Sequence, residues 1–179
     1  MSRTEQAIAA GGLTAAALDI IYAFVVYGPL SYGLSPMQVL QSVAAGWLGR
    51  DLARAGGWET ATLGAATHIL IALTMATVFV FAARKIASLA ARPVIAGLGY
   101  GLILYIVMNY VVVPLSAAHK AQRFPMSLAE AIERLQVAVT ALRPDDPMML
   151  LGTMLTHTVF VGLPIAVAAN RLLARADAQ

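Results

Sequence analysis

Three ionisable side chains lie inside long apolar stretches of this sequence: Asp19, His68 and His157. An ionisable residue at the centre of a membrane helix costs about 2.5 to 3.5 kcal/mol on insertion scales, so such residues are functional candidates. Two imidazoles and a carboxylate could hold a divalent metal, relay protons or bind a small polar solute. Two histidines on separate helices would also suit axial ligation of a b-type haem.

The three residues are expected at one depth in the membrane. Counted from the outer ends of their helices, Asp19, His68 and His157 lie about 12, 12 and 13 Å deep at the usual helical rise. Asn109, about 8 Å deep, is close enough to join them. Small residues share the helical faces of Asp19 and His68, which predicts that both side chains point into a bundle. The alternative role for this set is interhelical hydrogen bonding alone.

Four transmembrane helices are the elements that must position these residues. A hydrocarbon core about 30 Å thick requires apolar runs of about 20 residues. Such runs occupy residues 7–30, 60–83, 93–115 and 148–169. Because 60% of the chain is apolar and only 12% is charged, it has too few charges to cover a soluble globule. We therefore expect an all-α integral membrane four-helix bundle in a lipid bilayer, formed by residues 1–179 as one domain.

The distribution of Lys and Arg predicts the orientation of the chain. One side of the membrane carries a dense set: Arg3, Arg84, Lys85, Arg92, Arg171 and Arg175. On the other side the basic residues are spread over two longer connections, which favours N-in and C-in. Basic residues flank apolar runs and form no stripe with aromatic residues, so nucleic-acid binding is excluded. The absence of cysteine excludes disulfides and thiolate metal sites.

Each of the two outer connections is predicted to contain a helix, within residues 36–52 and 125–142. Both segments follow a proline with helix-favouring residues. In the second, four apolar residues recur at helical spacing, with Glu130, Glu133 and Arg134 on other faces: Leu128, Ile132, Leu135 and Val139. This is the pattern of an interfacial amphipathic helix that lies on the membrane or caps the bundle.

Short identities in a fixed order indicate an internal duplication, with residues 7–83 as the first repeat and 93–170 as the second. Pro29-Leu30-Ser31 returns as Pro114-Leu115-Ser116, and Thr67-His68 returns as Thr156-His157. His68 and His157 would then be symmetry mates. In the third helix, Gly97 and Gly101 form a GxxxG pattern, which predicts close helix packing and sometimes a homo-oligomer interface.

The histidines also carry a resemblance to a known family. Thr67-His68, Asn109 five residues before Pro114-Leu115, and His157 resemble the uncharacterised bacterial YagU-like inner-membrane proteins. In that family a histidine also lies in the second and fourth helices, and a polar residue, often histidine, precedes Pro-Leu in the third. Asn109 takes that third position here, which argues against strong metal binding. The resemblance implies an inner-membrane location and no known reaction.

Three functions are compatible with these features. The leading hypothesis is a membrane protein that handles protons or a cation at a buried site of Asp19, His68, His157 and Asn109. The alternative is a non-catalytic accessory or assembly subunit of a larger membrane complex, and the third is a b-type haem protein that passes electrons. No Ser-His-Asp set or carboxylate pair can be assembled, so the sequence favours a protein that is not an enzyme.

Overall fold

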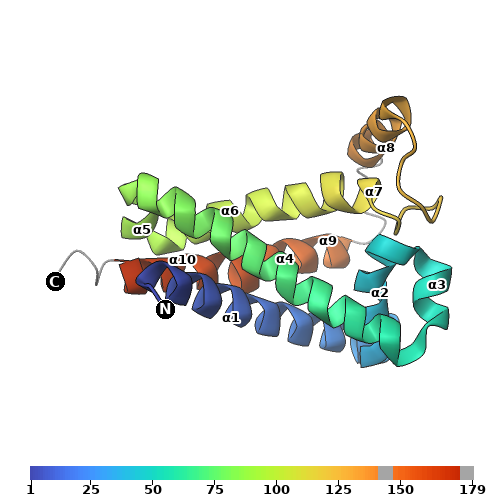
Figure 1. Cartoon of the computed structure of the whole chain (residues 1–179), viewed down its shortest axis with the longest axis horizontal. Helices are drawn as coiled ribbons and strands as arrows, with labels where there is room; N and C mark the ends of the chain where they lie inside the picture. Colours follow the sequence, from blue (N-terminus) through green and yellow to red (C-terminus); the bar gives the residue numbers. More distant parts are fainter. Residues whose placement is uncertain (141–146, 174–179) are drawn as a thin grey trace. The chain divides into compact units, whose positions relative to one another are not determined.

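The computed structural model describes residues 1–140 and 147–173, and the described chain is helical without a β-strand. Four helices are long and apolar enough to cross a membrane (Figure 1): Arg3–Leu30, Gly57–Lys85, Pro93–Leu115 and Leu150–Leu173. They coincide with the predicted spans to within a few residues at each end. The prediction of an all-α membrane protein with four helices is confirmed. Arg175 and residues 141–142 of the second outer connection lie outside the described residues.

Proline explains which of the four spans depart from α-helical geometry. The first consists of α1 (Arg3–Val25) and η1 (Val26–Leu30), a kinked segment in which the backbone dihedral angles of Gly28 are not helical. The third consists of α6 (Pro93–Val107), η2 (Met108–Val112) and α7 (Val113–Leu115). The fourth consists of α9 (Pro147–Leu155), η3 (Thr156–Gly162) and α10 (Leu163–Leu173). Each of the segments η1, η2 and η3 contains a proline or lies just before one, and proline removes a backbone hydrogen-bond donor. The second span, α4 (Gly57–Lys85), contains no proline and is α-helical throughout.

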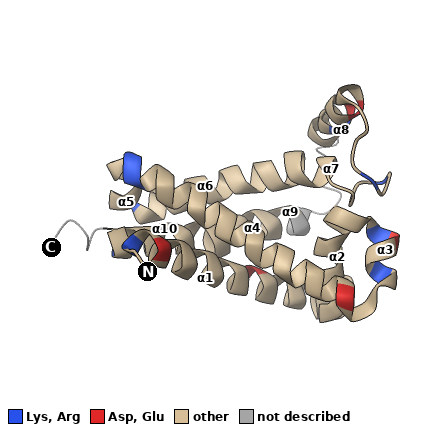
Figure 2. Cartoon of the chain, viewed as in Figure 1, with Lys and Arg blue, Asp and Glu red and all other residues tan. Residues whose placement is uncertain are grey.

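The helices contribute to two compact units. Unit 1 comprises Met1–Tyr22, Ile69–Tyr105 and Met148–Gln179, and unit 2 comprises Ala23–His68 and Ile106–Pro147. The first three spans therefore each contribute to both units, while the fourth from Leu150 to Leu173 belongs to unit 1. In α4 the charged residues lie at the two ends, Glu59 in unit 2 and Arg84 with Lys85 in unit 1 (Figure 2).

Small side chains form most of the core of unit 1. Its buried residues come from α1, α4, α6, η3 and α10: Ala7, Ala15, Ala76, Phe79, Val80, Ala83, Leu104, Val161, Ile165, Ala166 and Ala169. Alanine at these positions lets helices approach closely, as is usual between membrane helices. Hydrogen bonds also join segments of unit 1. The Tyr100 hydroxyl of α6 donates to the Met75 carbonyl of α4 at 2.7 Å, and the Asn170 amide of α10 donates at 2.7 Å to the carbonyl of Ala90 in α5 (Ala87–Ala91).

Gly97 and Gly101 pack inside unit 1 against the fourth span. A Cβ added to Gly97 would lie 2.8 Å from the Leu163 Cα, and one added to Gly101 would lie 2.4 Å from the Thr158 Cα. Gly162 meets both glycines from the other side. The close packing predicted from GxxxG is therefore made within one chain. Both glycines are buried there, so they do not offer an outer face to a second copy.

Unit 2 contains the first outer connection, which forms α2 (Pro36–Leu48) and α3 (Arg50–Ala55). Ser35 and Gln38 form a capping box at the start of α2, and Pro36 stands in the first turn, where its missing amide costs nothing. The buried Gln41 side chain donates to the Gly57 carbonyl at 3.0 Å. These contacts fix α2 against the start of α4, and they confirm the helix predicted in this connection.

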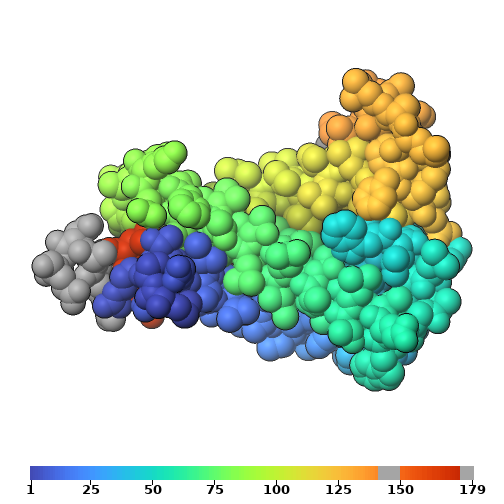
Figure 3. Space-filling model, in the orientation of Figure 1, coloured from blue at the N-terminus to red at the C-terminus, as the bar shows by residue number. Residues whose placement is uncertain are grey.

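The second outer connection contains the predicted helix, α8 (Leu128–Thr140), at the molecular surface (Figure 3). Its polar side is turned toward its own loop, because Arg134 is only 4% exposed and donates to the Arg123 carbonyl and to Glu130. Hydrogen bonds to its carboxylate lower the pKa of Glu130 to about 2; the largest contribution is from the Met126 amide and smaller ones are from Arg123 and Arg134. Leu128 and Ile132, in contrast, are exposed. The described residues therefore leave these apolar side chains of α8 uncovered.

Candidate functional site

The structure assigns the four predicted site residues to the two units in pairs. Asp19 in α1 and His157 in η3 belong to unit 1, whereas His68 in α4 and Asn109 in η2 belong to unit 2. All four are half-buried. Asp19, His68 and Asn109 each have an interaction partner, so none of them is an isolated polar group.

His157 has the most fully defined surroundings. Its Nδ1 atom lies 2.9 Å from the carbonyl oxygen of Thr153, one turn earlier in the helix. A carbonyl oxygen only accepts hydrogen bonds, so Nδ1 carries the proton in this contact. In the neutral ring Nε2 then bears the lone pair and is the atom that can take up a proton or bind a metal. The backbone contact therefore fixes both the orientation and the tautomer of the imidazole.

Tyr105 of α6 holds the imidazole of His157 from the neighbouring span. The two rings meet edge to face, with centroids 6.0 Å apart and planes at 79°. Tyr105 is 7% exposed, so this side of the imidazole faces the protein interior. Gly101, one turn before Tyr105, contacts the backbone of His157 and Thr158 and so allows the two helices to approach at this level. Tyr105 was not among the predicted site residues; its position one helical turn after Gly101 was the available signal.

The backbone around His157 is π-helical, in the seven residues of η3 that precede Leu163-Pro164. Such segments are rare and often occur at functional sites. Two threonine hydroxyls next to His157 are satisfied within the helix, since Thr156 donates to the Gly152 carbonyl at 2.7 Å and Thr158 to the Met154 carbonyl at 2.8 Å. These threonines thus pair their own hydroxyl groups within the helix.

Asp19 lies at the same level as His157 in unit 1. The register follows from contacts on either side, because Gly11 packs against the backbone of Ile165 and Gly152 packs against the Tyr22 hydroxyl. These pairs show α1 antiparallel to the fourth span, with Asp19 between Gly11 and Tyr22 and His157 between Gly152 and Ile165. A carboxylate and an imidazole are thereby brought to one depth of the same unit.

In unit 2, His68 directly follows Thr67, whose side chain accepts a hydrogen bond from a residue of the first outer connection. The Trp47 indole donates to the hydroxyl of Thr67 at 3.0 Å, and Thr67 is buried. Gly64, one turn before His68, packs against the backbone of Leu40 in α2. The small-residue face that the sequence predicted for His68 is therefore a packing face. No sequence pattern connects Trp47 with the site, yet its indole donates to the residue next to His68.

No three His, Asp or Glu side chains of residues 1–140 and 147–173 gather as the ligands of one metal ion would. Unit 1 contributes Asp19 and His157 to the predicted metal set, and unit 2 contributes His68. An ion held in unit 1 would therefore take its remaining ligands from hydroxyl, carbonyl or water oxygens, a set that suits hard cations better than zinc.

Comparison with known proteins identifies no relative that would decide between these chemistries. No family model matches the chain, and neither a curated protein nor a solved structure matches it.

Proposed function

We propose that this protein is an inner-membrane protein that handles protons, with His157 as the group that takes up and releases the proton. The observation that carries the proposal is the bond from Nδ1 to the Thr153 carbonyl, which leaves Nε2 as the basic atom inside a span. Imidazole is the only side chain whose ordinary pKa lies between 5 and 8, so it can change charge near neutral pH.

Asp19 is the proposed counter-charge of the His157 imidazolium. A carboxylate nearby favours the charged form of an imidazole, and Asp19 lies at the level of His157 in the same unit. A small cation is the alternative cargo, since the same carboxylate could compensate its charge. His68 and Asn109 provide the corresponding polar groups of unit 2.

The proposed location is the bacterial inner membrane, with both ends of the described chain on the cytoplasmic side. The resemblance to YagU-like proteins supports the inner-membrane location, and the density of Lys and Arg at one end of the spans supports the orientation. In unit 1, that end carries Arg3, Arg84, Lys85, Arg92 and Arg171.

A proton-flux assay tests the proposal. The full chain is reconstituted into liposomes containing a pH-sensitive dye, and proton entry is driven by a potassium diffusion potential. We expect His157→Gln to reduce the flux at least ten-fold, the usual scale for loss of an acid–base group being about 10² to 10⁴. His119→Gln, at a histidine in a loop outside the spans, is the matched control and should conduct like the wild type.

The amount of folded protein must be measured beside the flux, because His157→Gln also removes a hydrogen bond worth about 1 kcal/mol. Circular dichroism and size-exclusion chromatography serve this purpose. A well-folded His157→Gln variant that conducts like the wild type, or a wild type that conducts no protons, would contradict the proposal. The first result would favour the accessory-subunit hypothesis.

Binding of a b-type haem is a second candidate function. An imidazole that ligates haem iron or another metal through Nε2 typically donates its Nδ1 hydrogen to a protein acceptor, as His157 does to the Thr153 carbonyl. An absorption spectrum and a metal analysis of the detergent-purified protein decide this point. If the wild type shows a Soret band or stoichiometric metal and His157→Gln loses it, cofactor binding becomes the role of His157 in place of proton handling.

A further inference from the structure

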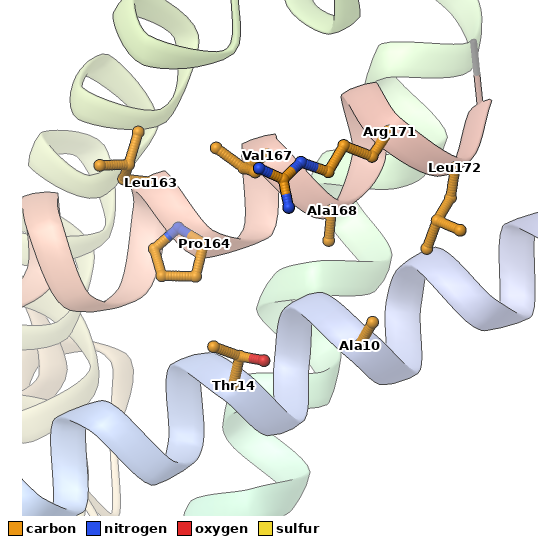
Figure 4. A pocket seen from close by; sticks show the side chains of 8 residues that line it. All are labelled: Ala10, Thr14, Leu163, Pro164, Val167, Ala168, Arg171 and Leu172. Carbon is orange, nitrogen blue, oxygen red and sulfur yellow. The ribbon is translucent and has the colours of Figure 1, made fainter. Parts of the chain in front are cut away.

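An apolar groove runs between α1 and α10 on the outside of unit 1 (Figure 4). Its volume is about 570 Å³. Ala10 and Thr14 line one side, and residues from Leu163 to Leu172 line the other, among them Pro164 and Arg171. Among the described residues that line it, only Thr14 and Arg171 have polar side chains.

Small side chains explain why a groove exists between two helices that otherwise touch. At its floor, Gly11 approaches the backbone of Ile165, where an added Cβ would lie 3.1 Å from the Ile165 Cα. Above this floor, Ala10 and Ala168 are too short to fill the space between the helices, and the Pro164 ring projects into it (Figure 4). Both helices belong to spans, so the groove opens toward lipid.

The groove has a charged end. Arg171 lies in the last turn of the span, and its guanidinium extends back over Val167 along the groove (Figure 4). Among the described residues no carboxylate forms an ion pair with it. Other basic residues of unit 1 lie at the ends of spans: Arg3 at the start of the first, Arg84 at the end of the second and Arg92 just before the third. The Arg171 guanidinium at one end of the apolar groove is complementary to a molecule that has one anionic group and a long hydrocarbon tail.

We propose that this groove binds one anionic phospholipid, with its phosphate at Arg171 and an acyl chain along Val167 and Pro164. Basic pockets between membrane helices on the cytoplasmic side are suited to anionic headgroups. The apolar part selects a lipid over free phosphate, because one exposed guanidinium alone would hold inorganic phosphate only weakly. This inference does not depend on the proton chemistry of His157.

Native mass spectrometry of the detergent-purified full chain tests the proposal, with phosphatidylglycerol and phosphatidylcholine as competing probes. The wild type should retain one phosphatidylglycerol in preference to phosphatidylcholine. Arg171→Gln should weaken that preference about five-fold, the factor expected for one basic residue at an anionic membrane surface. Arg92→Gln removes the same charge from the same unit away from the groove and should keep the preference.

Two further measurements separate the groove from general charge. Ala10→Phe places a ring in the groove from an exposed position, so it should reduce the retention of both lipids while leaving the fold intact. Millimolar inorganic phosphate should not displace phosphatidylglycerol. Equal effects of Arg171→Gln and Arg92→Gln, unchanged retention in Ala10→Phe, or displacement by free phosphate would each overturn the proposal.

Discussion

Replacing Gly101 with alanine should separate the third span from the fourth beside His157. The added Cβ would lie 2.3 Å from the His157 carbonyl oxygen and 2.4 Å from the Thr158 Cα. Ordinary contacts between carbon atoms begin near about 3.5 Å, so α6 and η3 must move apart by roughly an ångström. Both obstructing atoms belong to the backbone, and no side-chain rotation can relieve the clash.

The expected cost follows from overpacking of a close-packed interior, which typically destabilises a protein by about 1 to 3 kcal/mol. Gly99→Ala is the matched control, since it makes the same change two residues away in α6, where an added Cβ meets nothing within 4 Å. Alanine in a helix is favoured over glycine by about 0.5 to 1 kcal/mol, so this variant should be slightly stabilised. The same propensity gain applies to Gly101→Ala, so the two variants should differ by the overpacking cost of about 1 to 3 kcal/mol.

Unfolding by SDS, followed by circular dichroism in mixed micelles, measures this difference. Size-exclusion chromatography with light scattering is recorded in parallel, because a homo-oligomer interface at Gly101 would respond differently. Equal unfolding free energies for Gly101→Ala and Gly99→Ala would refute the packing described for α6 and η3. A loss of oligomer without a change in unfolding would place Gly101 on an outer interface instead.

Two further predictions concern unit 2. The pKa of Glu130 is lowered from its ordinary value of 4.5 to about 2. The bonds of its carboxylate therefore stabilise α8 fully at a pH above 4.5, and this contribution is lost as the pH falls toward about 2. Glu130→Gln should accordingly speed amide hydrogen exchange in Leu128–Thr140 at neutral pH, whereas Glu133→Gln, at an exposed residue of α8, should not. Trp47→Phe removes the bond to Thr67 and should lower the free energy of unfolding by about 1 kcal/mol, while Trp58→Phe, at a 73% exposed indole, should have no effect.

The spans were predictable from the sequence because hydrophobic length is a local property of the chain. The close approach at Gly97 and Gly101 was predictable for a similar reason, since two glycines one turn apart leave a flat helix surface. What the glycines meet was not predictable, because Gly162 lies far away in sequence and contributes no pattern of its own. The duplication of residues 7–83 and 93–170 stays a prediction.

The site was predictable only as a set of residue types. Asp19 and His157 were expected at one depth, and the antiparallel register of unit 1 places them at one level. The tautomer of His157 depends on its contact with the Thr153 carbonyl, which has no sequence signature. For the ring contact with Tyr105, the position of this residue one turn after Gly101 was the only signal. Similarly, the spacing in α8 identified an apolar face, but the burial of Arg134 against the Arg123 carbonyl decided which face turns inward.

Proton flux into liposomes that contain wild type or His157→Gln tests the central claim most directly. We predict a flux that requires the imidazole, falls at least ten-fold in His157→Gln and persists in His119→Gln at equal amounts of folded protein. Equal flux in wild type and His157→Gln, or no flux above that of empty liposomes in the wild type, would contradict the assignment of His157 as the proton carrier.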